Sequence, residues 1–153
     1  MKLDDRWETG IVARKSVPIL MLEDEKDYAD MFRDYIHDPS EPFSLNVVQS
    51  GEEAIAYLSG ESVFADRSKY PFPFLILVDL KMPGTGGFGV LRWLVAHPEI
   101  KNKLYVVILS GIQSTKEIEV VYELGAALFW AKSDTERLRD ELCRLRDSWI
   151  RLN

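Results

Sequence analysis

The stretch LILVDLKMPG, residues 75–84, combines a buried strand with a charge that such a strand does not usually carry. Its first four residues are apolar enough to be buried on both faces of a sheet, yet Asp79 follows them at once, before a Met-Pro-Gly turn. Desolvating an unpaired carboxylate costs several kcal/mol, so a buried strand should end in a neutral turn residue unless the charge has a role. Asp79 is therefore the first candidate for a functional residue.

The segment over 74–78 is one of five short apolar runs that lack an in/out alternation, which is typical of parallel strands buried on both faces. The other four are residues 17–22, 43–48, 104–109 and 126–130. Between and after these runs, apolar residues recur with a helical period over residues 24–36, 51–58, 87–96, 114–124 and 133–152. Five strands alternating with five helices predict an α/β fold, a doubly wound parallel sheet with helices on both faces. We expect the flavodoxin-like strand order 2-1-3-4-5.

Two of the predicted helices carry specific signals. The first has an apolar stripe that should face the core, formed by Tyr28, Met31, Phe32, Tyr35 and Ile36. The last opens with Ser133 and Glu136 at the spacing of a capping box, and its stripe continues through Trp149 and Leu152. The connection over 60–73 is longer than usual for this fold, which indicates a functional loop or an insertion.

Composition limits the class of protein. At 153 residues with 46% hydrophobic content, the chain can bury one sizeable core, which we place over residues 17–153, after a tail over residues 1–16. A net charge of -6 disfavours binding to nucleic acid. The single cysteine excludes an internal disulfide and fits a reducing cytosol. No run approaches the roughly 18 apolar residues of a membrane span, so we expect a cytoplasmic protein.

Three acids should meet at one edge of the sheet. Glu23 and Asp24 end the first strand, and Asp79 ends the third. In a sheet of order 2-1-3-4-5, sites form beyond the carboxyl ends of the strands where strand order reverses, between strands one and three. Carboxylates this close cannot all stay ionised without a cation or a steeply raised pKa. A few-carboxylate site with room for water and a phosphate suits Mg²⁺.

Two more polar residues follow strands that end at the same edge. Ser110 comes directly after the fourth strand and Lys132 after the fifth. Three acids, one hydroxyl and one lysine suit phosphoryl transfer to a carboxylate, in which Asp79 attacks, Lys132 offsets charge on the phosphoryl oxygens and Ser110 donates to one of them. Taken singly, Asp79, Glu23 and Asp24 could instead cap a helix or satisfy a turn.

The chain resembles the CheY-like receiver domain of two-component response regulators over roughly residues 17–149. The motifs are the acid pair in LMLEDE, the acceptor in LILVDLKMPG, the hydroxyl in VVILSG and the lysine in FWAK, in the family's order and spacing. The resemblance implies that a sensor histidine kinase phosphorylates Asp79. It also implies Mg²⁺ held by Asp24, Asp79 and the backbone carbonyl of Lys81, with Glu23 assisting through water.

The family also implies a switch in which Ser110 moves toward the phosphoryl group and Phe129 swings inward. Phe129 could equally be a core aromatic residue. The sequence departs from the family's commonest pattern where Ser133 replaces a proline, Phe129 a tyrosine and Gly86 an acid. A cis peptide before serine would cost about 2.5–4 kcal/mol, so we expect the Lys132–Ser133 bond to be trans. The long loop and the HPEIKNKLYVVILSG segment are similar to single-domain regulators paired with bacterial phytochromes.

We therefore expect a single-domain response regulator, which is not an enzyme beyond its own phosphorylation and dephosphorylation. Its output would pass to a downstream protein through the surface of the helix over 114–124, the last strand and the last helix. The apolar stripe reaching Trp149 and Leu152 suggests a homodimer. One alternative is a pseudo-receiver, an interaction module that takes no phosphate. Another is an electron carrier or hydrolase on the same fold.

Overall fold

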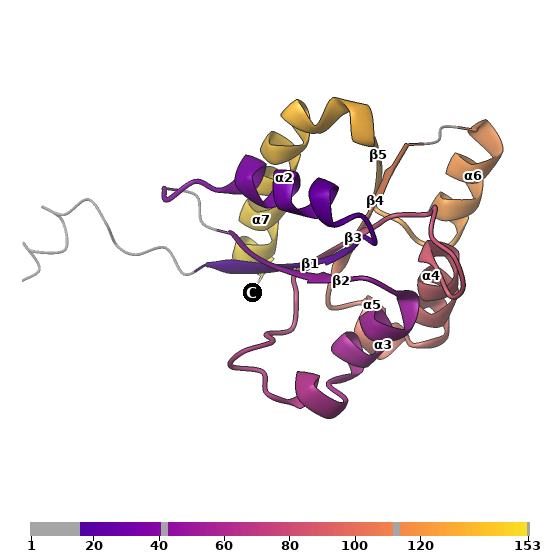
Figure 1. Cartoon of the computed structure of the whole chain (residues 1–153), viewed down its shortest axis with the longest axis horizontal. Helices are drawn as coiled ribbons and strands as arrows, with labels where there is room; N and C mark the ends of the chain where they lie inside the picture. Colours follow the sequence, from indigo (N-terminus) through magenta and orange to yellow (C-terminus); the bar gives the residue numbers. More distant parts are fainter. Residues whose placement is uncertain (1–15, 41–42, 112–113, 153) are drawn as a thin grey trace, which may run out of the picture.

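The computed structural model describes residues 16–40, 43–111 and 114–152, which fold around one parallel sheet (Figure 1). The strands are β1 (Val17–Leu22), β2 (Phe43–Val48), β3 (Leu75–Val78), β4 (Tyr105–Ser110) and β5 (Leu128–Ala131). Their order is β2-β1-β3-β4-β5, and all four neighbouring pairs are parallel. The predicted fold class and strand order are confirmed. The expected tail lies outside the described residues except for Ser16.

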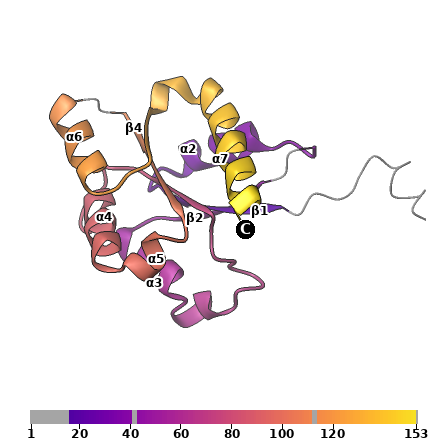
Figure 2. The same cartoon turned by 180° about the vertical axis from the view of Figure 1, so that it is seen from behind.

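Helices cover both faces of the sheet (Figures 1 and 2). Two helices pack on one face and share a core with β1, β3 and β4: α2 (Lys26–Ile36) and α7 (Leu138–Leu152). Three helices pack on the opposite face: α3 (Gly51–Ser59), α4 (Gly87–Ala96) and α6 (Thr115–Glu123). None of the described helices is long and apolar enough to cross a membrane.

The two cores explain why the strands are apolar on both sides. Successive side chains of a strand point to opposite faces, so Ile19 packs in the core under α2 and α7 while Leu20 packs in the core under α3 and α4. All four residues of β3 are at most 1% exposed. Leu22 of β1 pairs with Val78 of β3, which places Glu23 and Asp79 one residue beyond the same rung of the sheet.

The structure corrects two sequence-based predictions in the helices. The side chain of Met31 is 51% exposed and does not belong to the buried face of α2, which is formed by Ala29, Phe32 and Ile36. The capping box at Ser133 and Glu136 was wrong, because both residues lie in a 3-10 helix (Lys132–Arg137) with no side-chain cap, and α7 begins only at Leu138.

The turn after β5 has a local cause. The indole N–H of Trp130 donates a hydrogen bond to the backbone carbonyl of Asp134. Asp134 has φ -120° and ψ 48°, which are not helical angles, so the chain kinks before α7 can begin. The described peptide bonds, including Lys132–Ser133, are trans, as expected.

The connections also differ from the sequence pattern in detail. A short helix, α5 (Pro98–Lys101), follows α4, with Pro98 in its first turn, where a missing N–H costs nothing. The long loop over 60–73 contains a 3-10 helix (Ser62–Ala65). Within this loop the guanidinium of Arg67 donates to the carbonyl oxygens of Tyr57, Leu58 and Tyr70 at 2.8, 3.0 and 3.2 Å. The loop is thereby fixed to the end of α3.

Candidate functional site

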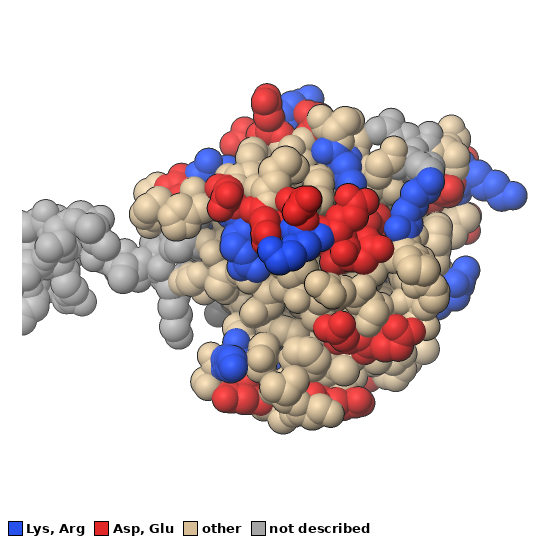
Figure 3. Space-filling model, viewed as in Figure 1, with Lys and Arg blue, Asp and Glu red and all other residues tan. Residues whose placement is uncertain are grey.

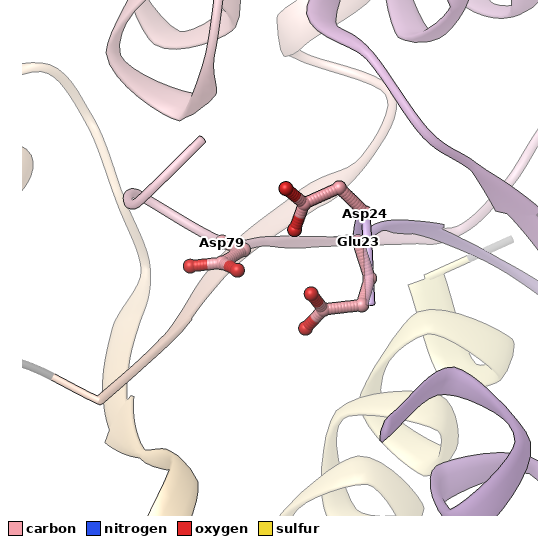
Figure 4. A group of neighbouring side chains, drawn as sticks. All are labelled: Glu23, Asp24 and Asp79. Atoms are coloured by element: carbon pink, nitrogen blue, oxygen red, sulfur yellow. The ribbon is translucent and has the colours of Figure 1, made fainter. Parts of the chain in front are cut away.

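The three predicted acids lie together at the carboxyl edge of the sheet. Figure 4 shows Glu23 and Asp24 following β1 and Asp79 following β3, with their carboxyl groups in one region. One oxygen from each lies within 4.8 Å of the other two. Glu23 is 1% exposed and Asp79 4% exposed, whereas Asp24 is exposed to solvent. The predicted convergence of three carboxylates is therefore present in the structure.

Backbone pairing holds the two buried acids in place. The Glu23 N–H donates to the carbonyl of Val48 at 3.0 Å, and the Asp79 N–H donates to the carbonyl of Leu22 at 3.2 Å. Each acid thus continues its strand's hydrogen bonding by one residue. The main chains of Glu23 and Asp79 are thereby held at fixed positions on neighbouring strands, from which both side chains extend at the same edge of the sheet.

Lys132 reaches the buried pair from the end of β5. Its Nζ lies 2.6 Å from Oε1 of Glu23 and 3.1 Å from Oδ2 of Asp79. The lysine side chain is 17% exposed. One ammonium thus bridges two carboxylates from different strands. The Ser133 that follows Lys132 in place of a proline has not moved the lysine away from the acids.

The turn after Asp79 is tightly packed against it. The Lys81 N–H donates to Oδ1 of Asp79 at 3.0 Å. Gly87, the first residue of α4, lies so close that a Cβ there would be 2.4 Å from the Asp79 carbonyl oxygen. Only glycine permits this approach of α4 to the end of β3. Gly86, where the family often has an acid, would place a Cβ 2.7 Å from the Met82 carbonyl oxygen.

Burial and neighbouring charges shift the ionisation of the site. Desolvation raises the pKa of Glu23 to about 6, with a further increase from the charge of Asp79 and an opposing effect from the hydrogen bond of Lys132. Desolvation alone would lower the pKa of Lys132, but its hydrogen bonds to Glu23 and Asp79 outweigh this and raise the pKa. The ammonium therefore stays charged at neutral pH.

The two predicted switch residues lie on the neighbouring strands. Ser110 is fully buried at the end of β4 and pairs with Ala131, the residue before Lys132. The hydroxyl thus belongs to the same edge of the sheet as the lysine. Phe129 is half-buried in β5 and packs against the core under α3, α4 and α6. Its N–H donates to the hydroxyl of Tyr122 on α6 at 3.1 Å.

One neighbour of the site was missed by the sequence motifs. The ring centroid of Tyr28 lies 4.4 Å from Nζ of Lys132, so the aromatic face contacts the ammonium. Burial raises the pKa of the Tyr28 hydroxyl to about 12. The available signal is its position one helical turn after Asp24, whereas the apolar period alone places Tyr28 only in the stripe of α2.

The residues present fit a hard divalent cation. With Glu23, Asp24 and Asp79 all ionised, three negative charges face the single positive charge of Lys132, which leaves two negative charges uncompensated. Carboxylate oxygens are the ligands that Mg²⁺ and similar hard cations prefer. Asp24 is solvent-exposed, which gives an ion access to the group while some of its water ligands remain.

Comparisons with known proteins agree with this geometry. The family model of the response regulator receiver domain matches residues 19–142. Response regulator Rcp1 of Synechocystis sp. is 27% identical over 115 residues, which cover 75% of this chain and 76% of that protein.

Solved structures give the same result. The phosphorylated cyanobacterial phytochrome response regulator RcpA superposes with a TM-score of 0.74 at 26% identity, covering 90% of this chain and 96% of that one. Response regulator RPA3017, in red light signalling of R. palustris, gives a TM-score of 0.67 at 30% identity, covering 74% of this chain and 78% of that one.

The chain belongs to the response regulator receiver family. Among receiver domains, it is related to the regulators of phytochromes. The matched segment contains all the site residues considered above and ends inside α7, at residue 142.

Proposed function

We propose that this receiver domain is a phosphorylation-controlled switch in which Asp79 accepts a phosphoryl group from the phosphohistidine of a sensor histidine kinase. A bond forms between one Asp79 carboxylate oxygen and phosphorus while the phosphorus–nitrogen bond breaks, and the imidazole leaves with the electron pair. The observation that carries the proposal is the bridging of Glu23 and Asp79 by Lys132, next to Asp24. Family membership favours it over an electron carrier or a hydrolase.

The chain's own groups supply position and charge for this transfer. The Lys81 N–H orients the Asp79 carboxylate through Oδ1. Nζ of Lys132 lies 3.1 Å from Oδ2 of Asp79, close enough to interact with the negatively charged phosphoryl oxygens during transfer. Asp24, Asp79 and the Lys81 carbonyl would hold Mg²⁺, with Glu23 assisting through water. When bound, the ion would offset charge on the transferring group. The chain would catalyse only its own phosphorylation and dephosphorylation.

Phosphorylation would be communicated through Ser110 and Phe129. Ser110 would donate to a phosphoryl oxygen, and Phe129 would move inward and alter the surface of α6, β5 and α7. The hydrogen bond from Phe129 to Tyr122 already links β5 to α6. That surface would bind a downstream protein.

A homodimer through α7 is a further part of the proposal. Leu152 is 77% exposed at the end of the helix, which leaves apolar surface for a second copy. Trp149, however, packs against Phe74 with ring centroids 5.8 Å apart, so much of its side chain belongs to the core of the domain.

The relatives bear on the choice of kinase and of partners. RPA3017 and RcpA are regulators of red light and phytochrome signalling, which supports a bacteriophytochrome kinase as the phosphoryl donor. Nucleic acid is not an expected partner. On the face seen in Figure 3, Lys and Arg side chains are interspersed with Asp and Glu and form no continuous basic surface among the described residues.

Intact-mass analysis after incubation with Mg²⁺ and acetyl phosphate tests the proposal. The wild type should gain the mass of one phosphoryl group, and Asp79→Asn should gain none. Asp27→Asn is the matched control, because it removes an exposed carboxylate near Asp24 that is not part of the metal-capable group. A wild type that gains no phosphate would instead support the alternative, a pseudo-receiver that acts only as an interaction module. An adduct that persists in Asp79→Asn would reject the assigned acceptor.

A further inference from the structure

Among the described residues, the ammonium of Lys132 contacts groups of two kinds. Two are the carboxylates of Glu23 and Asp79, at 2.6 and 3.1 Å from Nζ. The third is the ring of Tyr28, whose centroid is 4.4 Å from the same atom. The ammonium donates a hydrogen bond to Oδ2 of Asp79 and forms an ion pair with Oε1 of Glu23, so the aromatic face is a third contact that carries no charge. The negative face of an aromatic ring attracts a cation at this distance.

We infer that the Tyr28 ring is a positioning element of the phosphoryl site, which holds the Lys132 ammonium in place without neutralising it. The inference rests on the proposed function. A third carboxylate at this position would also hold the ammonium, but it would repel the incoming phosphoryl oxygens. An aromatic ring has no net charge, so the full positive charge of Lys132 remains available to an anion.

The contact matters because of how Lys132 is presented. The lysine has a flexible four-carbon stem, and ordering such a side chain costs conformational entropy. It follows the end of β5 and begins a 3-10 helix that contains the kinked residue Asp134. Phosphorylation of Asp79 would consume one carboxylate partner of Lys132. The ring contact involves no reacting atom, so phosphoryl transfer does not itself remove it.

The ring of Tyr28, and not its hydroxyl, is the group that makes this contact. The hydroxyl oxygen is buried and has no hydrogen-bond partner among the described residues. Removing a buried hydroxyl that bonds to nothing leaves no partner unsatisfied, so phenylalanine should serve as well as tyrosine. Leucine would preserve apolar packing on the core shared by α2 and α7 but would remove the aromatic face.

The experiment compares the full-length wild type with Tyr28→Phe and Tyr28→Leu. Phosphoryl uptake from acetyl phosphate at saturating Mg²⁺ is followed by intact mass, and the side-chain protons of Lys132 are followed by NMR. We expect Tyr28→Phe to stay within about twofold of the wild-type rate and Tyr28→Leu to be roughly three- to tenfold slower. The aromatic ring-current shift of the Lys132 side chain should survive in Tyr28→Phe and disappear in Tyr28→Leu.

Thermal unfolding and Mg²⁺ affinity show whether each variant keeps the fold and the metal site. If leucine at position 28 unfolds the domain, Tyr28→Met is used in place of Tyr28→Leu. Equal rates for Tyr28→Leu and the wild type would overturn the role of the ring. A rate for Tyr28→Phe as low as that for Tyr28→Leu would assign the effect to the hydroxyl and also overturn it. A wild type that takes up no phosphate would overturn the proposed function itself, whereas the rates of the Tyr28 variants bear only on the role of the ring.

Discussion

Lys132 and Glu23 form the shortest ion pair of the site, with 2.6 Å between Nζ and Oε1, against 3.1 Å from the same Nζ to Asp79. The buried glutamate therefore holds the lysine more closely than the proposed phosphoryl acceptor does. A metal ion that interacts with Glu23, directly or through water, would have to share this carboxylate with the ammonium of Lys132. This competition links metal binding to the position of Lys132.

The affinity of the site for Mg²⁺ should rise with pH between about 5 and 7. Desolvation raises the pKa of Glu23 to about 6, so at pH 5 most molecules carry a neutral Glu23. Metal binding favours the ionised carboxylate, and binding at low pH must therefore release a proton. Calorimetric titration at several pH values measures the effect. In Glu23→Gln the same titrations should lose most of this pH dependence, and an unchanged dependence would contradict the assignment.

The same shift predicts how the metal-free protein responds to pH. Burial raises the pKa of the Glu23 carboxyl from its ordinary value of 4.5 to about 6, so between these pH values the folded state binds more protons than the unfolded state. Protonation of Glu23 therefore adds about 2 kcal/mol to the free energy of unfolding below pH 4.5. This contribution is lost as the pH rises through 6. Urea unfolding of the wild type and Glu23→Gln without metal measures this. A glutamine variant with the same pH profile as the wild type would show that another group is responsible.

Mg²⁺ should stabilise the fold through Asp24. A ligand that binds only the folded state at a hundredfold excess over its Kd adds about 2.7 kcal/mol to the free energy of unfolding. We expect the melting temperature to rise with Mg²⁺ in the wild type and in Asp27→Asn, and to stay constant in Asp24→Ala. Asp24 contributes an exposed carboxylate to the metal-capable group, so its removal should harm the metal-free fold little. A metal-dependent rise that survives in Asp24→Ala would remove this residue from the ligand set.

The convergence of the acids could be predicted because it depends only on strand ends and strand order. Residues of β3 are apolar on both sides, which identifies a central parallel strand, and the pairing of Leu22 with Val78 then places Glu23 beside Asp79. Lys132 follows the same logic at the end of β5. Neighbouring parallel strands end at one edge, so no detail of side-chain packing was needed.

Features that depend on side-chain packing could not be predicted in this way. Ser133 and Glu136 form no capping box because Asp134, which lies between them, has non-helical backbone angles, and the Trp130 indole donates to its carbonyl. Met31 has the right spacing for the apolar stripe, but it lies at the solvent-exposed margin of α2. The contact of Tyr28 with Lys132 joins residues from α2 and β5 and has no spacing rule.

Gly87→Ala should disturb the acceptor directly. A Cβ at this position would lie 2.4 Å from the Asp79 carbonyl oxygen and 2.9 Å from Cγ1 of Val78, so α4 or the end of β3 must shift. Overpacking of this kind costs about 1–3 kcal/mol, and the shift should also slow phosphoryl uptake. Gly111→Ala is the matched control, because a Cβ there would meet no atom of the described residues within 4 Å. Chemical unfolding and the acetyl phosphate assay measure both effects, and a Gly87→Ala variant that matches Gly111→Ala would contradict the close approach.

Arg67→Met should destabilise the domain without changing the site. The Arg67 guanidinium donates to three carbonyls, of which those of Tyr57 and Leu58 belong to the last turn of α3. Carbonyls at a helix C-terminus lack intrahelical partners, so losing these donors should lower the free energy of unfolding by about 1–3 kcal/mol. The guanidinium carbon also lies 5.7 Å from the centroid of the Phe72 ring. Methionine removes the charge and the donors but keeps an unbranched apolar side chain at this position.

Lys69→Met is the control for Arg67→Met, since Lys69 is exposed in the same loop and should change stability by less than about 0.5 kcal/mol. Mg²⁺ affinity should be the same in both variants, because α3 begins at the carboxyl edge of the sheet and ends away from it. Urea unfolding and metal titration provide the two measurements. Equal stability losses in the two variants would mean that the loop over 60–73 is held by something other than the guanidinium. A changed metal affinity in Arg67→Met alone would mean that the loop acts on Asp79 through β3.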